Sequence, residues 1–88
     1  MTTKDILETE AAHILQTYKR APIVLSRGKG VHLFDDAGQE YTDLLSGIGV
    51  ASLGHAHPGL AAAIADQAAT LVHTSNLYFH PLQGQLAA

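Results

Sequence analysis

The stretch that decides the fold is Val31–Leu44, VHLFDDAGQEYTDL, in the middle of the chain. Its two ends, residues 31–35 and 40–44, contain the β-branched and aromatic residues that favour extended strands. Residues 36–39 between them are typical of a tight turn, because Gly38 is able to take the left-handed backbone conformation that closes a hairpin. The stretch therefore predicts an antiparallel hairpin.

A further strand is expected just before this hairpin. Residues 23–26, IVLS, are largely apolar and β-branched, and residues 27–30, RGKG, carry two glycines that indicate a turn. Together with the hairpin, these segments predict a three-stranded antiparallel meander.

A helix is expected before the meander. Thr2 and Asp5 have the spacing of a capping box, and the apolar residues that follow recur at helical intervals. This pattern predicts a helix over about residues 4–17. The glycine-rich segment after the meander, residues 46–57, shows little periodicity and predicts a loop.

Two more helices are expected after this loop. Pro58 stands at a favoured first helical position, and an apolar stripe follows it over about residues 58–72. His80-Pro81 has the form of another helix start, and no capping signal follows before Ala88, so this helix is expected to continue past the end of the chain. The predicted fold class is an α+β segment with an N-terminal helix, a three-stranded antiparallel meander and then helices.

The composition excludes several classes of protein. Five basic residues against eight acidic ones give a net charge of −3 and form no basic run, so no nucleic-acid partner is expected. Without cysteine, neither a disulfide framework nor a thiolate metal site is available. The first ten residues lack the apolar stretch of a signal peptide, and no membrane partner is expected. The expected location is the cytoplasm.

The balance of apolar and charged residues indicates surface that another part of a protein covers. Apolar residues make up 47% of the chain and charged residues only 15%. This apolar share is high for a domain of 88 residues whose surface faces water. The single core of a domain with 88 residues leaves little room to enclose a substrate. No residue is assigned a catalytic role, because no serine has a nucleophile-elbow context and none of the three lysines has a buried setting.

Two histidines form the one pattern that resembles a metal site. His55 and His57 have a spacing that would let both rings reach one ion. However, no third ligand stands at a recognisable spacing, and the place of His57 directly before Pro58 explains it as the residue that precedes a helix. No metal site is therefore predicted.

Two loops are candidates for ligand contact. Residues 46–50, SGIGV, follow a strand as phosphate loops do, but a GxGxxG pattern would require glycine where Ser52 stands. These glycines indicate close approach to either another chain segment or a ligand, and both interpretations stay open. Residues 75–78, SNLY, offer an amide, a hydroxyl and an aromatic face for a small polar ligand. Alternatively, Ser75 and Asn76 cap the loop while Tyr78 packs.

The order and spacing of several segments together resemble a known family. They are RGKG at 27–30, DDAGQEY at 35–41, YTDLLSGIGV at 41–50, LGHAHP at 53–58, and HTSNLY at 73–78. This series resembles the start of class III pyridoxal-phosphate-dependent aminotransferases, and the LGH and HTSN segments are most similar to the acetylornithine branch of that class. The resemblance extends from about Tyr18 to the end of the chain.

The resemblance implies a fold and an activity. It implies the N-terminal part of a fold-type I homodimer, with residues 1–57 as arm and meander of the small domain and 58–88 as the beginning of the large cofactor-binding domain. It further implies pyridoxal 5'-phosphate as cofactor and transfer of an amino group from N-acetyl-L-ornithine to 2-oxoglutarate in arginine biosynthesis. The Schiff-base lysine and the main cofactor ligands of the family lie beyond residue 88, so this chain alone is expected to be inactive.

The resemblance also implies which residues approach the substrate. In relatives the loop that matches Ile48 and Gly49 and the loop that matches Ser75, Asn76 and Tyr78 line the substrate entrance. An aromatic hydroxyl at the position of Ile48 accompanies ornithine as donor in some relatives, and an isoleucine suits a less polar, acetylated donor. The alternatives are another class III enzyme, acting on succinylornithine, ornithine or 4-aminobutyrate, or a small stand-alone binding module of a different class.

Overall fold

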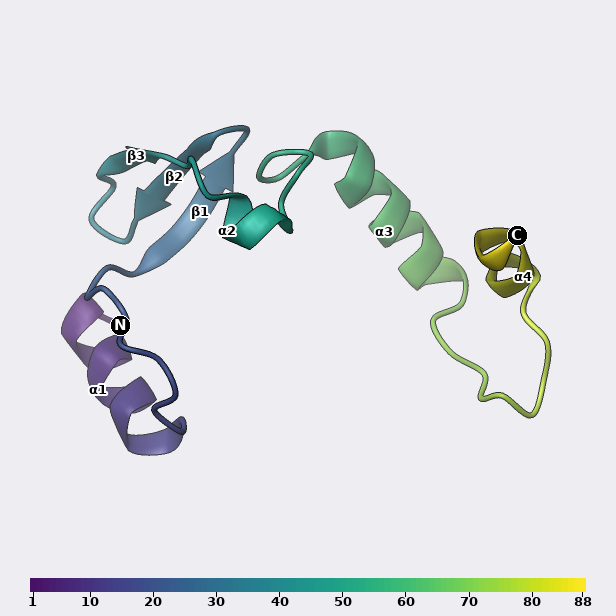
Figure 1. Ribbon diagram of the computed structural model, residues 1–88, viewed down its shortest axis with the longest axis horizontal. Coiled ribbons are helices and arrows are strands. Elements are labelled where there is room, and N and C mark those ends of the chain that lie inside the picture. The colour runs from purple at the N-terminus through teal and green to yellow at the C-terminus, as the bar shows by residue number, and fades with distance from the viewer. The chain divides into compact units, whose positions relative to one another are not determined.

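The computed structural model describes residues 1–88, which form two compact units, Met1–His57 and Pro58–Ala88. The first contains the helix α1, the strands β1, β2 and β3 and the short turn α2 (Figure 1). The second contains the helices α3 and α4. The assignment of these units to a small and a large domain stays a prediction.

Helix α1 (Thr3–His13) begins with the predicted capping box. The Thr2 hydroxyl oxygen accepts the backbone N–H of Asp5 at 3.1 Å, and the Asp5 carboxylate accepts the N–H of Thr2 at 2.9 Å. These bonds satisfy N–H groups that have no partner inside the helix. The N–H of Thr2, and then the Thr2 hydroxyl that donates to the same carboxylate at 2.8 Å, lower the pKa of Asp5. Thr3 also donates to the Asp36 carboxylate (2.6 Å), which joins the start of α1 to the β2–β3 turn.

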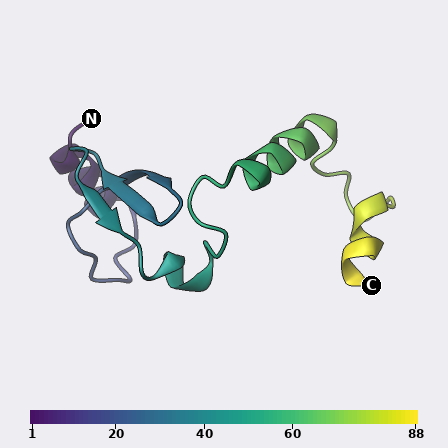
Figure 2. The same cartoon turned by 90° about the horizontal axis from the view of Figure 1, so that it is seen from above.

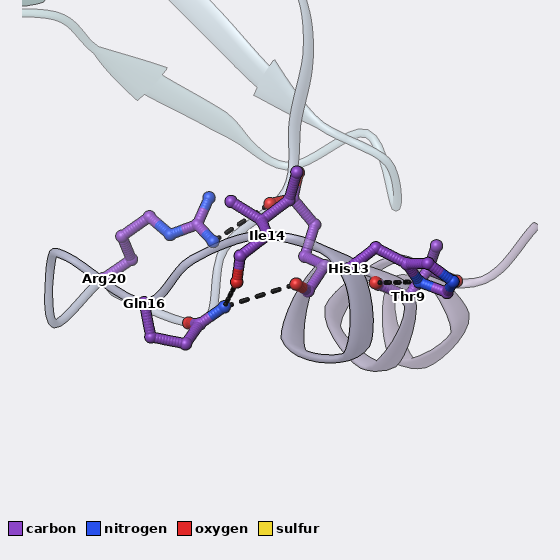
Figure 3. A network of polar contacts seen from close by, with 6 residues as sticks. Thr9, His13, Ile14, Gln16 and Arg20 are labelled. Carbon is purple, nitrogen blue, oxygen red and sulfur yellow. Dashed lines mark hydrogen bonds and ion pairs between the residues drawn. The ribbon is translucent and has the colours of Figure 1, made fainter.

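The predicted end of α1 near residue 17 is wrong, because the helix stops at His13 and Ile14 is extended. The Gln16 side chain binds the end of the helix. Its amide nitrogen donates to the Glu10 carbonyl (3.2 Å), which also accepts the N–H of Ile14 (2.9 Å), and to the Ile14 carbonyl (2.6 Å) (Figure 3). Arg20 closes the segment with an ion pair to the Glu10 carboxylate at 3.0 Å.

The three-stranded antiparallel meander is confirmed. Strands β1 (Leu25–Lys29), β2 (His32–Asp35) and β3 (Glu40–Thr42) lie side by side in chain order (Figure 2). The fold class, an α+β segment with helices on both sides of the meander in the sequence, is confirmed with it.

The first turn of the meander lies later than predicted. Residues 27–29 belong to β1 and pair with β2, so the expected turn at 27–30 is wrong. Lys29 pairs with His32, which leaves Gly30 and Val31 as a two-residue loop. Gly30 has φ +60°, a conformation that glycine adopts without the steric cost of a side chain, and therefore the turn forms there.

The second turn forms where the sequence predicted it. Gly38 has φ +87°, as expected for the residue that closes this hairpin. One oxygen of the Asp35 carboxylate accepts the N–H groups of Ala37 (3.0 Å) and Gln39 (2.8 Å), and the other accepts the Tyr41 hydroxyl (3.1 Å). The N–H of Gln39 is the main cause that lowers the pKa of Asp35. The last strand ends at Thr42 rather than Leu44, because Asp43 turns to bind the backbone that follows.

Both helices of the second unit are confirmed. Helix α3 (Pro58–Thr70) begins at Pro58 and ends slightly before the predicted residue 72, where the Gln67 amide donates to the Leu71 carbonyl at 2.8 Å. Helix α4 (Pro81–Ala87) begins after His80, whose Nδ1 accepts the N–H of Leu82 at 3.1 Å. None of the helices in the chain combines the length and the apolar character that crossing a membrane requires.

The chain has no hydrophobic core of its own. No residue is buried, and apolar side chains such as Leu44, Phe79 and Leu86 are almost completely exposed. The chain exposes 7741 Å² of surface. A compact folded monomer of 9.3 kDa exposes about 5,000 Å² by the usual relation between surface and mass. The apolar surface is therefore far larger than a small free domain carries.

We expect the isolated 88-residue chain to lose its structure without a cooperative transition, because no buried side chains couple its elements. Urea titration followed by far-ultraviolet and near-ultraviolet circular dichroism should give broad curves that do not coincide. Fluorescence of the dye ANS should be higher before urea is added than after complete unfolding. One sharp transition of a monomer, with the same midpoint by both signals, would contradict this expectation.

Candidate functional site

Ile48 and Gly49, two predicted site residues, lie in the short turn α2 (Ser46–Gly49), which has an unusual backbone. All four residues have positive φ angles, +56°, +59°, +61° and +82° in chain order. Because the N–H of Gly49 reaches back to the Leu45 carbonyl at 3.1 Å, they form one left-handed helical turn. The sequence predicted a loop here and not this turn.

Ile48 is the residue for which this conformation is least expected. A left-handed backbone brings the Cβ atom close to the carbonyl oxygen, and β-branched residues rarely adopt it. The Ile48 side chain is nevertheless 83% exposed, so packing within the chain does not stabilise it. Strain of this kind persists only where neighbouring contacts determine the backbone, and it is frequent at ligand sites.

Asp43 supplies such contacts at the start of the turn. Its Oδ1 accepts the N–H groups of Leu45 and Ser46, both at 2.9 Å, and its Oδ2 accepts Nε2–H of His55 at 2.6 Å. The N–H of Ser46, then the His55 ring and the N–H of Leu45, lower the pKa of the Asp43 carboxyl, because each bond favours the charged form. The Asp43 side chain is 9% exposed, whereas most of the chain is open to solvent.

His55 is held by the sheet. Its N–H donates to the Gly30 carbonyl (2.8 Å), and its carbonyl accepts the N–H of Gly30 (2.9 Å), so His55 pairs with the β1–β2 turn. The ring lies against Gly28 of β1, where an added Cβ atom would stand 2.7 Å from the Cβ of His55. Gly28 therefore leaves the space that the His55 side chain fills.

The paired histidines 55 and 57 do not gather metal ligands. The His55 ring binds Asp43, and no group of three or more histidine, aspartate or glutamate side chains lies close enough together to hold an ion. The residue between them, Ala56, has φ +52°, which turns the chain between the two histidines. The role of His55 is thus an ion pair or hydrogen bond to a carboxylate.

Ser75, Asn76 and Tyr78, the other predicted site residues, lie together between α3 and α4. They line one open hollow of about 640 Å³. Its remaining lining includes the polar side chains of Gln67, His73, His80, Gln83 and Gln85 and the apolar side chains of Leu71, Val72, Leu82 and Leu86. A hollow of this size with few charged groups suits a small ligand or a covering segment of protein.

The side chains of this loop divide between structural and free groups. The Ser75 hydroxyl oxygen accepts the N–H of Leu77 at 3.3 Å, and Ser75 has φ +71°, so its hydroxyl caps the loop as the alternative interpretation of this segment expected. The Asn76 amide binds no other residue of the chain. Tyr78 is 71% exposed, so its ring does not pack within this chain.

The structure thus brings Ser75, Asn76 and Tyr78 together and places Ile48 and Gly49 in the other unit. Sequence reasoning missed Asp43 as a functional residue. An aspartate shortly before a serine, where a strand gives way to a turn, is a known signal for bonds to the following N–H groups and would have indicated two of its contacts. No sequence signal indicated that His55 would be its third partner.

Comparison with known proteins gives the family. Residues 14–88 match the family model of class-III aminotransferases. The acetylornithine aminotransferase of Methanothermobacter thermautotrophicus is 48% identical over 87 residues, which cover 99% of this chain and 22% of that protein. The crystal structure of acetylornithine aminotransferase from Elizabethkingia anophelis matches with a TM-score of 0.90 at 33% identity, over 97% of this chain and 22% of that one.

Ornithine aminotransferases match equally well in structure. The Plasmodium falciparum ornithine delta-aminotransferase has a TM-score of 0.89 at 32% identity, over 97% of this chain and 22% of that one. The chain therefore spans about a fifth of the length of the relatives it matches. Since the family match covers most of its residues, the chain belongs to the class-III aminotransferases.

Proposed function

We propose that this chain forms the N-terminal segment of an acetylornithine aminotransferase and contributes the loops that select the amino donor. The observation that carries this proposal is the 48% identity to a protein of that name over nearly the whole chain. The proposed reaction moves an amino group between N-acetyl-L-ornithine and 2-oxoglutarate, in arginine biosynthesis. A homodimer in the cytoplasm is part of the same proposal.

The family implies pyridoxal 5'-phosphate as cofactor, which acts as an electron sink when bound. The residues of this chain do not fit its main binding requirements. All three lysines, Lys4, Lys19 and Lys29, are exposed and lie in the first unit. No lysine, arginine, aspartate or glutamate lines the hollow of the second unit. We therefore propose that the groups that hold the cofactor belong to the rest of the enzyme and that the 88 residues alone are inactive.

The proposed contribution of this chain is recognition of the donor. Ile48 offers an exposed apolar side chain on a constrained backbone, which suits contact with the acyl-ornithine chain. Gly49 lets the backbone turn without a side chain in the way. At the other loop, the unpaired Asn76 amide and the exposed Tyr78 ring suit a polar ligand, while Ser75 holds the loop in shape.

Ornithine as donor is the second candidate, since solved ornithine aminotransferases match the chain with similar TM-scores. Sequence favours the acetylornithine assignment, because the named relatives of higher identity are acetylornithine aminotransferases. A stand-alone binding module is disfavoured by the absence of any buried residue.

We expect a chimera to have acetylornithine aminotransferase activity when residues 1–88 replace the matching segment of the Methanothermobacter thermautotrophicus enzyme. Its kcat/KM for N-acetylornithine should lie within about tenfold of the parent, a difference of about 1.4 kcal/mol. Glutamate formation measures the reaction. The 88-residue chain with added cofactor is the control and should form none. A folded, cofactor-loaded chimera without activity would contradict the proposal, as would activity of the short chain.

Ile48→Tyr in this chimera should shift donor preference toward ornithine without the acetyl group. The new hydroxyl offers a hydrogen bond to the polar amino group, and it takes the place of apolar contact with the acylated donor. The ratio of kcat/KM for the two donors should change by roughly tenfold.

Ile48→Phe is the matched control for this change, because it introduces a ring without the hydroxyl. It should lower activity with both donors and leave ornithine disfavoured. An unchanged ratio of kcat/KM in the Ile48→Tyr chimera would show that residue 48 does not select the donor.

A further inference from the structure

The left-handed turn α2 places a β-branched side chain in a conformation that the backbone disfavours. Ser46 and Ile48 have φ angles of +56° and +61°, where only glycine and a few small polar residues are common. Neither residue is buried, so no packed core compensates for the strain. Polar contacts to the backbone must therefore maintain the turn.

Besides backbone bonds of the turn itself and the bond from the Ser52 hydroxyl to the Gly49 carbonyl (2.8 Å), these contacts come from one carboxylate. Asp43 Oδ1 binds the two consecutive N–H groups of Leu45 and Ser46, and these groups lead directly into the left-handed residues. With Oδ1 occupied in this way, Asp43 Oδ2 points to His55 Nε2 at 2.6 Å. A charge-assisted bond of this length is strong and directional.

His55 connects the carboxylate to the sheet. Two backbone hydrogen bonds to Gly30 fix its main chain to the β1–β2 turn, and the absence of a side chain at Gly28 gives its ring a defined place. Both side chains are largely covered, with 23% of the His55 side chain and 9% of the Asp43 side chain open to solvent. A continuous path therefore joins the hairpin to Ile48.

We propose that Asp43 and His55 act as a positioning pair that holds the backbone entering the turn 46–49 and thereby fixes Ile48 for selection of the amino donor. The inference rests on the proposed function and adds two residues to it. Asp43 and His55 do not touch the substrate in this proposal. They act through the backbone of the turn, and the exposure of the Ile48 side chain leaves it available for a ligand.

The test uses the full-length chimera and its variant His55→Ala. Loss of the ring frees Asp43 Oδ2 and loosens the turn, so KM for N-acetylornithine should rise about tenfold while KM for 2-oxoglutarate stays unchanged. In His55→Gln the donor KM should stay near that of the parent chimera, because the glutamine amide N–H reaches toward the position of Nε2. In an Ile48→Ala background, His55→Ala should raise the donor KM no further. His55 acts on the donor through the Ile48 side chain, which this background lacks.

Two control variants, His32→Ala and Gly84→Ala, and a second test variant, Gly28→Ala, separate positioning from general destabilisation. His32→Ala removes another histidine–carboxylate pair, with Glu40 at 3.0 Å across β2 and β3, and should leave the donor KM unchanged. Gly28→Ala crowds His55 without changing either member of the pair and should raise the donor KM as His55→Ala does. Gly84→Ala, where an added Cβ meets nothing within 4 Å, is its matched control. Thermal unfolding of each chimera shows whether it is folded.

The outcomes distinguish the inference from the function on which it rests. A folded wild-type chimera without acetylornithine activity would overturn the proposed function and the positioning role together. An active chimera in which His55→Ala leaves the donor KM unchanged, raises both KM values equally, or keeps its effect in the Ile48→Ala background would overturn the positioning pair alone. If His55→Ala fails to fold, the donor KM of Gly28→Ala is compared with that of Gly84→Ala. A higher donor KM in Gly28→Ala alone supports the positioning pair, and equal values overturn it.

Discussion

Backbone pairing of the meander, residues 25–42, is the interaction on which the first unit depends. No residue is buried, so the hydrophobic contribution that stabilises ordinary domains is small. Each hydrogen bond contributes about 1 kcal/mol net, whereas ordering a residue costs about 1–2 kcal/mol. The ladder therefore defines a conformation but does not stabilise it alone, which agrees with a chain that spans a fifth of its relatives' length.

The same shortage of packing explains why polar contacts shape the candidate site. The bridge between Gly30 and His55 extends the ladder by one pair, and Asp43 carries this order from His55 to the turn that contains Ile48. Side chains that pack in a core would be inaccessible to a ligand. Hydrogen bonds to the backbone hold the turn and leave its apolar side chain exposed, as a donor-binding loop in the proposed function requires.

Local signals in the sequence predicted the elements well and their ends less well. The capping box at Thr2, the turn at Gly38 and the helix start at Pro58 depend on neighbouring residues only, and each formed as predicted. The helix predicted to reach residue 17 stopped at His13, where the Gln16 amide binds the carbonyls of Glu10 and Ile14. A pattern of apolar residues does not show such contacts of a side chain with the backbone.

The sequence by itself determined the α+β class, the family resemblance and the two loops proposed to approach the substrate. Only the tertiary structure decided that Asp43 and His55 meet and that Ser46–Gly49 forms a left-handed turn. The reason is physical. His55 reaches Asp43 because it pairs with Gly30, and that pairing follows from the register of the hairpin and the bare backbone at Gly28. Contacts between residues far apart in the chain depend on register and space, which no local pattern of residues encodes.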